Sequence, residues 1–151
     1  MLVDKFLEFC DATDVSAAAG TALVGDVIDL TTIGLDLNAP NQGLFLVVQV
    51  TTAFTSGGSS TNQFKIVTDA AAAIATDGTA TEHALSSVLG KATLVADYQL
   101  VLPLARGAGG SYERYMGVLN VTAAATTTAG SINAFLSLSP PAATLFAEAA
   151  N

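Results

Sequence analysis

Few side chains of this 151-residue chain have the chemistry that catalysis requires. There is one cysteine, Cys10, and one histidine, His83. Together they would form a thiol–imidazole dyad, in which the imidazole takes the thiol proton and leaves a nucleophilic thiolate. The alternative is that Cys10 is a small buried hydrophobic residue and that His83 lies on the surface of a strand. We favour the alternative, because free cysteines are among the most buried residue types.

Two pairs of carboxylates are spaced closely enough to approach one metal ion. Asp11 is followed by Asp14, and Asp26 by Asp29. A calcium loop, however, needs six or more oxygen ligands from a patterned segment, and neither pair has the spacing of an EF-hand. We therefore expect solvated turns at both places, with no metal and no cofactor.

The glycine-rich stretch from Arg106 to Gly110 resembles a phosphate-binding loop only in its glycines. It lacks the Gly-Lys-Ser/Thr ending of such a loop, and the segment after it reads as a strand and not as a helix. We expect a turn here. Since no enzyme signature remains, the sequence predicts that the chain is not an enzyme.

The segments that would position these residues are organised around Gly43–Asp69. Within it, Leu44–Thr52 and Gln63–Thr68 alternate apolar and polar positions with a period of two, which is typical of β-strands. A Gly/Ser loop separates them, so we expect the two strands to pair as an antiparallel hairpin. The first strand places Leu44, Leu46, Val48 and Val50 on one face.

The rest of the chain reads as further short strands separated by turns and by a loop or single helical turn at Ala70–Ala80. The expected strands lie within Gly20–Leu30, Thr81–Val88, Tyr98–Leu104, Tyr112–Thr122 and Ser131–Ser139. Short strands without a long amphipathic helix indicate an all-β jelly roll or β-sandwich. We expect one such domain over 20–139, preceded by an extended N-terminal arm (1–19) and followed by a C-terminal tail (140–151).

Composition excludes several classes of function. Five Lys and Arg residues against thirteen Asp and Glu give a net charge of −8, which disfavours nucleic acid and anionic membranes as partners. No apolar run approaches the roughly 20 residues of a membrane span. Charges at Asp4, Lys5 and Glu8 interrupt any signal-peptide core. We expect a protein made in the cytoplasm, where one unpaired cysteine is unremarkable.

Five stretches in this order resemble one family: LVDKFLEFCDATDV, GDVIDL, LFLVVQVTTAFTSGG, QFKIVTDA and RYMGVLNVT. They are similar to the small jelly-roll capsid cement, or decoration, proteins of tailed bacteriophages, of the type carried by the Bordetella podophage. The similarity runs from near the N-terminus to about Gly130. The family leads us to expect a serine where this chain has Cys10.

The resemblance implies a structural virion protein that binds the outer surface of an expanded capsid and clamps neighbouring major capsid subunits as a homodimer or homotrimer. The alternative is a carbohydrate- or receptor-binding jelly-roll module of a virion. Such a site usually shows exposed aromatic residues, and this chain has no Trp and three Tyr. A metal-dependent enzyme of the cupin kind would need several histidines.

Large apolar residues precede the first convincing strand, where the core of the domain need not reach all of them. They are Leu2, Phe6, Leu7 and Phe9. We predict that they contact the capsid or a neighbouring subunit, although the arm could instead fold back over its own sandwich. Self-association is predicted through Tyr98–Leu104 and Ser131–Ser139, which carry many uncharged outward positions.

Overall fold

The computed structural model describes residues 5–34, 37, 43–104 and 112–139. Strands dominate this part of the chain, and its helical elements are one turn of 3-10 helix and one of α-helix. In chain order the elements are η1 (Lys5–Leu7), β1 (Glu8–Asp14), β2 (Gly20–Asp29), α1 (Leu30–Ile33), β3 (Phe45–Thr55), β4 (Thr61–Asp69), β5 (Thr81–Leu85), β6 (Leu89–Gly90), β7 (Gln99–Pro103), β8 (Tyr115–Ala123) and β9 (Ala129–Ser137).

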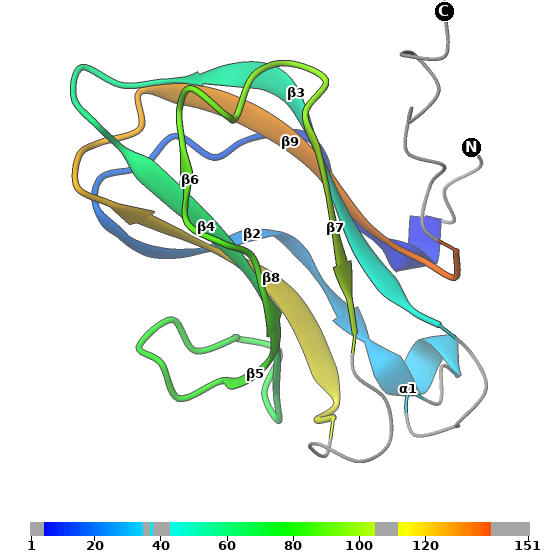
Figure 1. The fold of residues 1–151 in the computed structure, drawn as a ribbon. Coiled ribbons are helices and arrows are strands. Elements are labelled where there is room, and N and C mark those ends of the chain that lie inside the picture. The colour runs from blue at the N-terminus through cyan, green and yellow to red at the C-terminus, as the bar shows by residue number, and fades with distance from the viewer. Residues whose placement is uncertain (1–4, 35–36, 38–42, 105–111, 140–151) are drawn as a thin grey trace, which may run out of the picture.

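The strands form two antiparallel sheets that pack face to face (Figure 1). The first sheet has the order β1-β9-β3-β7, and the second has the order β2-β8-β4-β5 with β6 also paired to β4. Along most of the chain, successive strands therefore alternate between the sheets, which is the topology of a jelly roll. The prediction of an all-β jelly-roll sandwich is confirmed.

The predicted hairpin between Leu44–Thr52 and Gln63–Thr68 is wrong. Both segments are strands, but β3 pairs with β7 and β9 in the first sheet, whereas β4 pairs with β5, β6 and β8 in the second. The Gly/Ser loop between them thus crosses from one sheet to the other. Period-two alternation specifies a strand with a buried face, and it does not specify which strand lies beside it.

The main core fills the space between the sheets. As predicted, Leu44, Leu46, Val48 and Val50 point into it and are each at most 2% exposed. Phe54 of β3 meets Phe64 of β4 edge to face, with ring centroids 6.4 Å apart, and so joins the two sheets across the core. Aromatic pairs prefer this geometry, and burying such side chains is the main stabilising contribution in a sandwich.

A smaller apolar cluster lies on the outer face of the second sheet. It contains Val67, Ile74, Ala80 and Leu119, and Tyr115 packs against it. The segment Ala70–Ala80, predicted to be a loop or one helical turn, is a loop that carries Ile74 and Ala80 onto this face. The loop therefore covers apolar side chains that the main core cannot reach.

Two segments were predicted to self-associate through uncharged outward positions. Tyr98–Leu104 contains β7, the last strand of the first sheet. Ser131–Ser139 overlaps β9, which lies between β1 and β3, so the outward face of this strand, and not an edge, would make the contact. The turn predicted at Arg106–Gly110 and the tail 140–151 lie outside the described residues.

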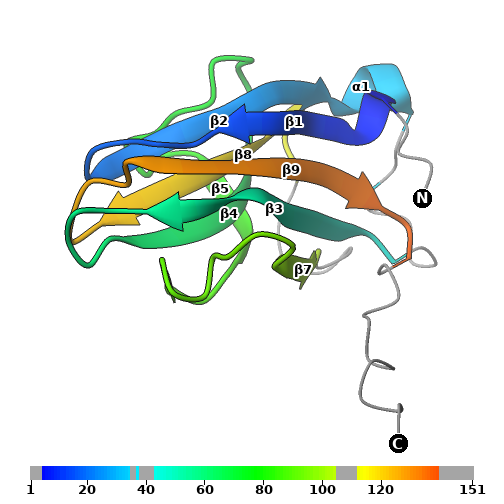
Figure 2. The same cartoon turned by 90° about the horizontal axis from the view of Figure 1, so that it is seen from above.

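The N-terminal segment is not a free arm over residues 8–14. These residues form β1, which pairs with β9 at the edge of the first sheet (Figure 2). Gly25 of β2 approaches this strand so closely that a Cβ atom there would lie 2.1 Å from the carbonyl oxygen of Phe9. The jelly roll thus begins at Glu8 and not at Gly20, because Phe9 and Cys10 are needed to complete its core.

Candidate functional site

The structure separates the residues that were predicted to contact the capsid. Phe6 in η1 is 68% exposed, Leu7 packs partly against the core, and Phe9 is 1% exposed. Leu2 lies outside the described residues. Phe9 is therefore a core residue and cannot contact the capsid. For this residue the alternative is correct, namely that the N-terminal segment folds back onto its own sandwich. Among the three described residues, Phe6 alone offers a large exposed apolar surface to a partner.

Phe6 borders a hollow of about 380 Å³ between the N-terminal segment and the end of β2, here called the N-terminal hollow. Its lining combines apolar and charged side chains, among them Phe6, Val27, Ile33, Lys5, Glu8 and Asp26. Lys5 Nζ forms an ion pair with Glu8 Oε1 at 3.0 Å. Asp26 forms no ion pair within the described part of the chain. The hollow therefore offers an aromatic ring beside an excess of negative charge.

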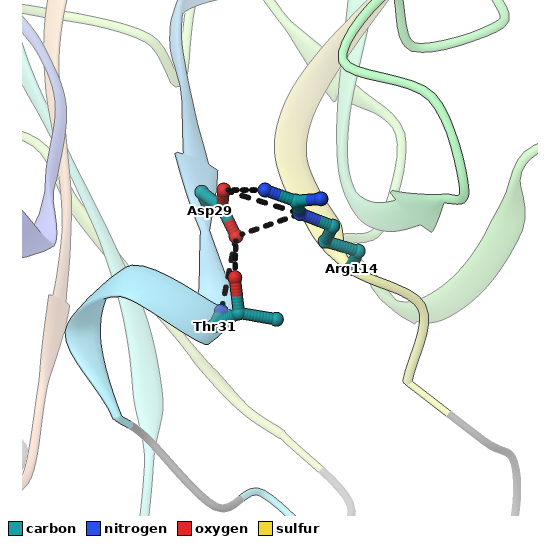
Figure 3. Close-up of polar contacts among 3 residues, drawn as sticks. All are labelled: Asp29, Thr31 and Arg114. Carbon is teal, nitrogen blue, oxygen red and sulfur yellow. Dashed lines mark hydrogen bonds and ion pairs between the residues drawn. The ribbon is translucent and has the colours of Figure 1, made fainter.

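One wall of the N-terminal hollow is fixed by Asp29, the last residue of β2 (Figure 3). Asp29 Oδ1 accepts hydrogen bonds from Thr31 N at 3.0 Å and from Thr31 Oγ1 at 2.7 Å, which caps α1. Arg114 donates from Nη2 to Asp29 Oδ2 at 2.8 Å and from Nε to both carboxylate oxygens at 3.2 Å. The junction of β2 and α1 is thereby tied to the residue that precedes β8.

These contacts hold the pKa of Asp29 well below its usual range. The hydrogen bonds from Arg114 are the largest cause, followed by the hydroxyl of Thr31. The guanidinium carbon of Arg114 also lies over the ring of Tyr115, 4.9 Å from its centroid, where the face of the ring attracts the positive charge. Arg114 is thus occupied within its own chain by both a carboxylate and an aromatic ring.

The structure does not bring Cys10 and His83 together. Cys10 belongs to β1 in the first sheet and His83 to β5 at the edge of the second. Burial raises the pKa of the Cys10 thiol to about 11, and its Sγ donates a hydrogen bond to the carbonyl oxygen of Ile132 at 3.5 Å. A buried, protonated thiol is a poor nucleophile. Cys10 therefore packs as a small core residue.

His83 is more enclosed than a strand surface residue. Its ring stacks on Tyr112 with centroids 3.9 Å apart, and its Nε2 lies 2.6 Å from Thr68 Oγ1. Partial burial lowers the pKa of His83. This side chain helps to pack β5 against β4 and the start of the β8 region, so it has a structural role in the sandwich.

Asp14 and Asp29, one from each of the two carboxylate pairs, are engaged by neighbouring side chains. Asp14 accepts hydrogen bonds from Ser16, and Asp29 is engaged by Thr31 and Arg114. In the described residues no group of three or more His, Cys, Asp and Glu side chains is placed to hold a metal ion. The helices of the same residues include none that is long and apolar enough to cross a membrane.

Sequence reasoning missed a second hollow, of about 360 Å³, on the outer face of the first sheet. Gln49, Gln99 and Asn133 line it together with Asp97, and we call it the amide hollow. One available signal was Gln49, a polar residue at an outward position between Val48 and Val50. The grouping of Gln49, Gln99 and Asn133 could not be predicted, because the three residues become neighbours only when β3 lies between β7 and β9.

Comparison with known proteins places this architecture in a family. A family model described as Bbp16 matches residues 9–136, which is most of the chain and spans β1 to nearly the end of β9. A search of curated proteins gives no match.

Proposed function

We propose that this chain, which belongs to the Bbp16 family, is a capsid cement protein of a tailed bacteriophage. The family name suggests a Bordetella phage protein. In this proposal the protein is made in the host cytoplasm, binds the outer surface of the expanded head, and clamps neighbouring major capsid subunits. The observation that carries the proposal is a jelly roll of a phage-related family. Its described residues contain neither a group of three or more metal-ligating side chains nor a Cys–His dyad.

The physical demands on a cement protein fit these features. It needs a rigid scaffold and contacts that are repeated over a symmetric shell, and it needs no catalytic chemistry. A protein that binds the assembled lattice, and not the dissociated subunits, stabilises the lattice by mass action. Many copies that each bind weakly are therefore enough to hold the shell together.

The N-terminal hollow is the contact that we propose for the shell. Phe6 is 68% exposed there, and Glu8 and Asp26 provide negative charge. A partner surface with a basic residue beside an apolar pocket would complement both features. Fully burying a Phe side chain is worth about 1.5–3 kcal/mol, so each copy could gain a substantial part of its affinity from this one ring.

The test is reconstitution on purified heads. Virions are purified, the protein is identified among their components, and heads stripped of it are heated with and without added protein. The proposal predicts that added protein co-sediments with expanded heads and raises the temperature at which they release DNA. Absence of the protein from virions, or no binding to stripped heads, would contradict a cement role.

A carbohydrate-binding role is the second candidate, and one observation favours it. Phe6 is an exposed aromatic ring beside the carboxylates of Glu8 and Asp26, a combination that can stack on a sugar and bind its hydroxyl groups. Screening the labelled protein against an array of bacterial surface glycans distinguishes the two functions. Binding that is lost in Phe6→Ala, without any binding to heads, would favour this candidate.

A further inference from the structure

His83 lies at a β-bulge in β5, the last strand of the second sheet (Figure 1). The register with β4 shifts between Glu82 and Ala84, so His83 is the extra residue between them. A bulge interrupts the alternation of a strand and redirects a side chain. Here the redirected imidazole lies against Thr68 of β4 and against Tyr112.

Three segments of the chain meet at the His83 side chain. Its Nε2 lies 2.6 Å from Thr68 Oγ1, and its ring stacks on Tyr112 with centroids 3.9 Å apart and planes inclined by 13°. Tyr112 packs against the main core, and the next residue, Glu113, donates from its backbone N to the same Thr68 Oγ1 at 3.2 Å. These four residues, here called the His83 cluster, therefore join β5 to β4 and to the segment before β8.

The hydrogen bond between Thr68 and His83 has a defined direction. Thr68 is 0% exposed, and its hydroxyl group has one proton to donate. Its Oγ1 already accepts from Glu113 N. Among the described residues, His83 Nε2 is the one acceptor within hydrogen-bonding distance of this hydroxyl. Thr68 therefore donates to an unprotonated Nε2, and the neutral ring carries its proton on Nδ1.

A second proton on the ring would reverse this hydrogen bond. A protonated Nε2 is a donor, so the buried Thr68 hydroxyl would lose its acceptor, and a buried donor without a partner destabilises the folded state. Partial burial of the ring also disfavours its positive charge, which is the main reason why the pKa of His83 is lowered. The closed arrangement of the His83 cluster thus requires the neutral ring.

The charges around the ring do not compensate for this cost. Glu113 raises the pKa of His83, but burial lowers it by more. No carboxylate of the described residues lies within ion-pair distance of the ring, and β7, which lies near β5, has no charged residue. The other charged side chains on the surrounding elements have partners of their own: Lys65 pairs with Glu82, Asp69 accepts from the backbone of Ala71 and Ala75, and Arg114 pairs with Asp29.

We propose that His83 is a pH-sensitive switch that holds β5 and the segment before β8 in place at neutral pH and releases them on acidification. In the open state the ring is charged and solvated, and the bulged end of β5 is detached from β4. The other end stays attached, because Ser86 N donates to Phe64 O at 2.8 Å and Phe64 N donates to Ser86 Oγ at 3.0 Å. Opening leaves one end of β4 as an uncovered strand edge, which is a surface for association. The switch depends on the jelly roll alone and not on a cement role.

The wild-type protein tests the switch by NMR. The nitrogen shifts of the labelled imidazole should show a ring protonated at Nδ1 at neutral pH and a titration midpoint below the ordinary value of 6.5. Because the folded-state pKa is lowered, the stabilisation by the neutral ring is present above pH 6.5 and is lost as the pH falls through the folded-state pKa. Protection of the β5 amides against hydrogen exchange, corrected for intrinsic rates, should fall at least about fivefold over the same titration.

Ser86 N is the internal control for this measurement and should keep its protection, because it lies beyond the end that opens. A proton on Nε2 at neutral pH, or a His83 midpoint at or above 6.5, would overturn the proposal. Unchanged protection of β5 would overturn it as well. An equal loss of protection at Ser86 N would show that the sheet opens as a whole, which contradicts a local switch.

Variants identify the groups that form the switch. Thr68→Val removes the hydroxyl and keeps the shape of the side chain, so the His83 midpoint should rise toward 6.5, whereas Thr68→Ser keeps the hydroxyl and should keep the wild-type midpoint. Equal midpoints in these two variants would refute the role of the hydroxyl. His83→Gln supplies a neutral acceptor that does not titrate, so protection of β5 should stay constant down to about pH 5. A loss in acid that persists in His83→Gln would assign the switch to another group and contradict the proposal.

Discussion

Replacing Phe6 by alanine separates binding from folding at the N-terminal hollow. The Phe6 ring is 68% exposed, so little of its surface contributes to the stability of the free protein. Phe9, three residues further on, is 1% exposed within the main core. The same substitution at these two positions should therefore have opposite consequences, which makes Phe9→Ala the matched comparison.

The magnitudes follow from the exposed fraction. Full burial of a Phe side chain is worth about 1.5–3 kcal/mol, so burying the exposed 68% of Phe6 in a shell contact contributes about 1–2 kcal/mol. That corresponds to a loss of about 5- to 30-fold in the affinity of a single contact on Phe6→Ala. The free energy of unfolding should change by less than about 0.5 kcal/mol, as for other exposed positions. In contrast, Phe9→Ala should cost about 3–5 kcal/mol of stability.

The assay combines urea denaturation of the free protein with sedimentation of labelled protein on stripped heads. Wild-type affinity in Phe6→Ala would refute the proposed contact, and a large loss of stability in this variant would show that the ring belongs to the core. Deleting Met1–Phe9 is a poorer test, because it removes the start of β1 and the buried Phe9 ring together. We expect that deletion to unfold the domain.

Further predictions concern the scaffold. Gly25→Ala should lower the free energy of unfolding by at least about 2 kcal/mol, because φ is +67° and the new Cβ would lie 2.1 Å from Phe9 O. Gly57 has open space around it, so Gly57→Ala should leave the free energy of unfolding nearly unchanged in the same urea denaturation assay. The pKa of Asp29 is lowered in the folded state, so its contribution to stability is present above the ordinary value of 3.8 and is lost as the pH falls through the folded-state pKa. The stability difference between wild type and Asp29→Asn should therefore be constant near neutral pH and shrink below about pH 4; a constant difference down to pH 2 would contradict this. A thiol reagent should modify Cys10 far more slowly in the native protein than in urea, and equal rates would show that β1 opens readily. Light scattering should show a homodimer or homotrimer, and a stable monomer at micromolar concentration would count against self-association.

The strands and their inward faces could be predicted because alternation is a local property of the chain. The burial of Leu46, Val48, Phe64 and Ile66 follows from it directly. Pairing is a long-range property, and here the local preference for a hairpin was misleading. The loop after β3 leads to the opposite sheet, since β9 and β7 already flank β3 and the inner face of each sheet is covered by the other sheet.

The N-terminal segment shows that long-range pairing also limited the prediction of the candidate site. The apolar residues Phe6, Leu7 and Phe9 were recognised, but their separate fates depend on β9, more than a hundred residues away in the sequence. Pairing with β9 turns Phe9 inward and leaves Phe6 before the strand. The amide hollow was missed for the same reason, because Gln49, Gln99 and Asn133 become neighbours only in the completed sheet.

The pairing of β1 with β9 also has a consequence for synthesis of the protein on the ribosome. β1 has no other partner in its sheet, so the Phe9 side chain stays without its sheet neighbour until β9 has been translated. At 5–20 residues per second, the interval between Asp14 and Ala129 lasts roughly 6–23 s. During that time the nascent chain exposes an apolar segment, and chaperones that bind short apolar stretches have time to hold it. A chain that is cut short before β9 would never close its sandwich and would be a substrate for proteases.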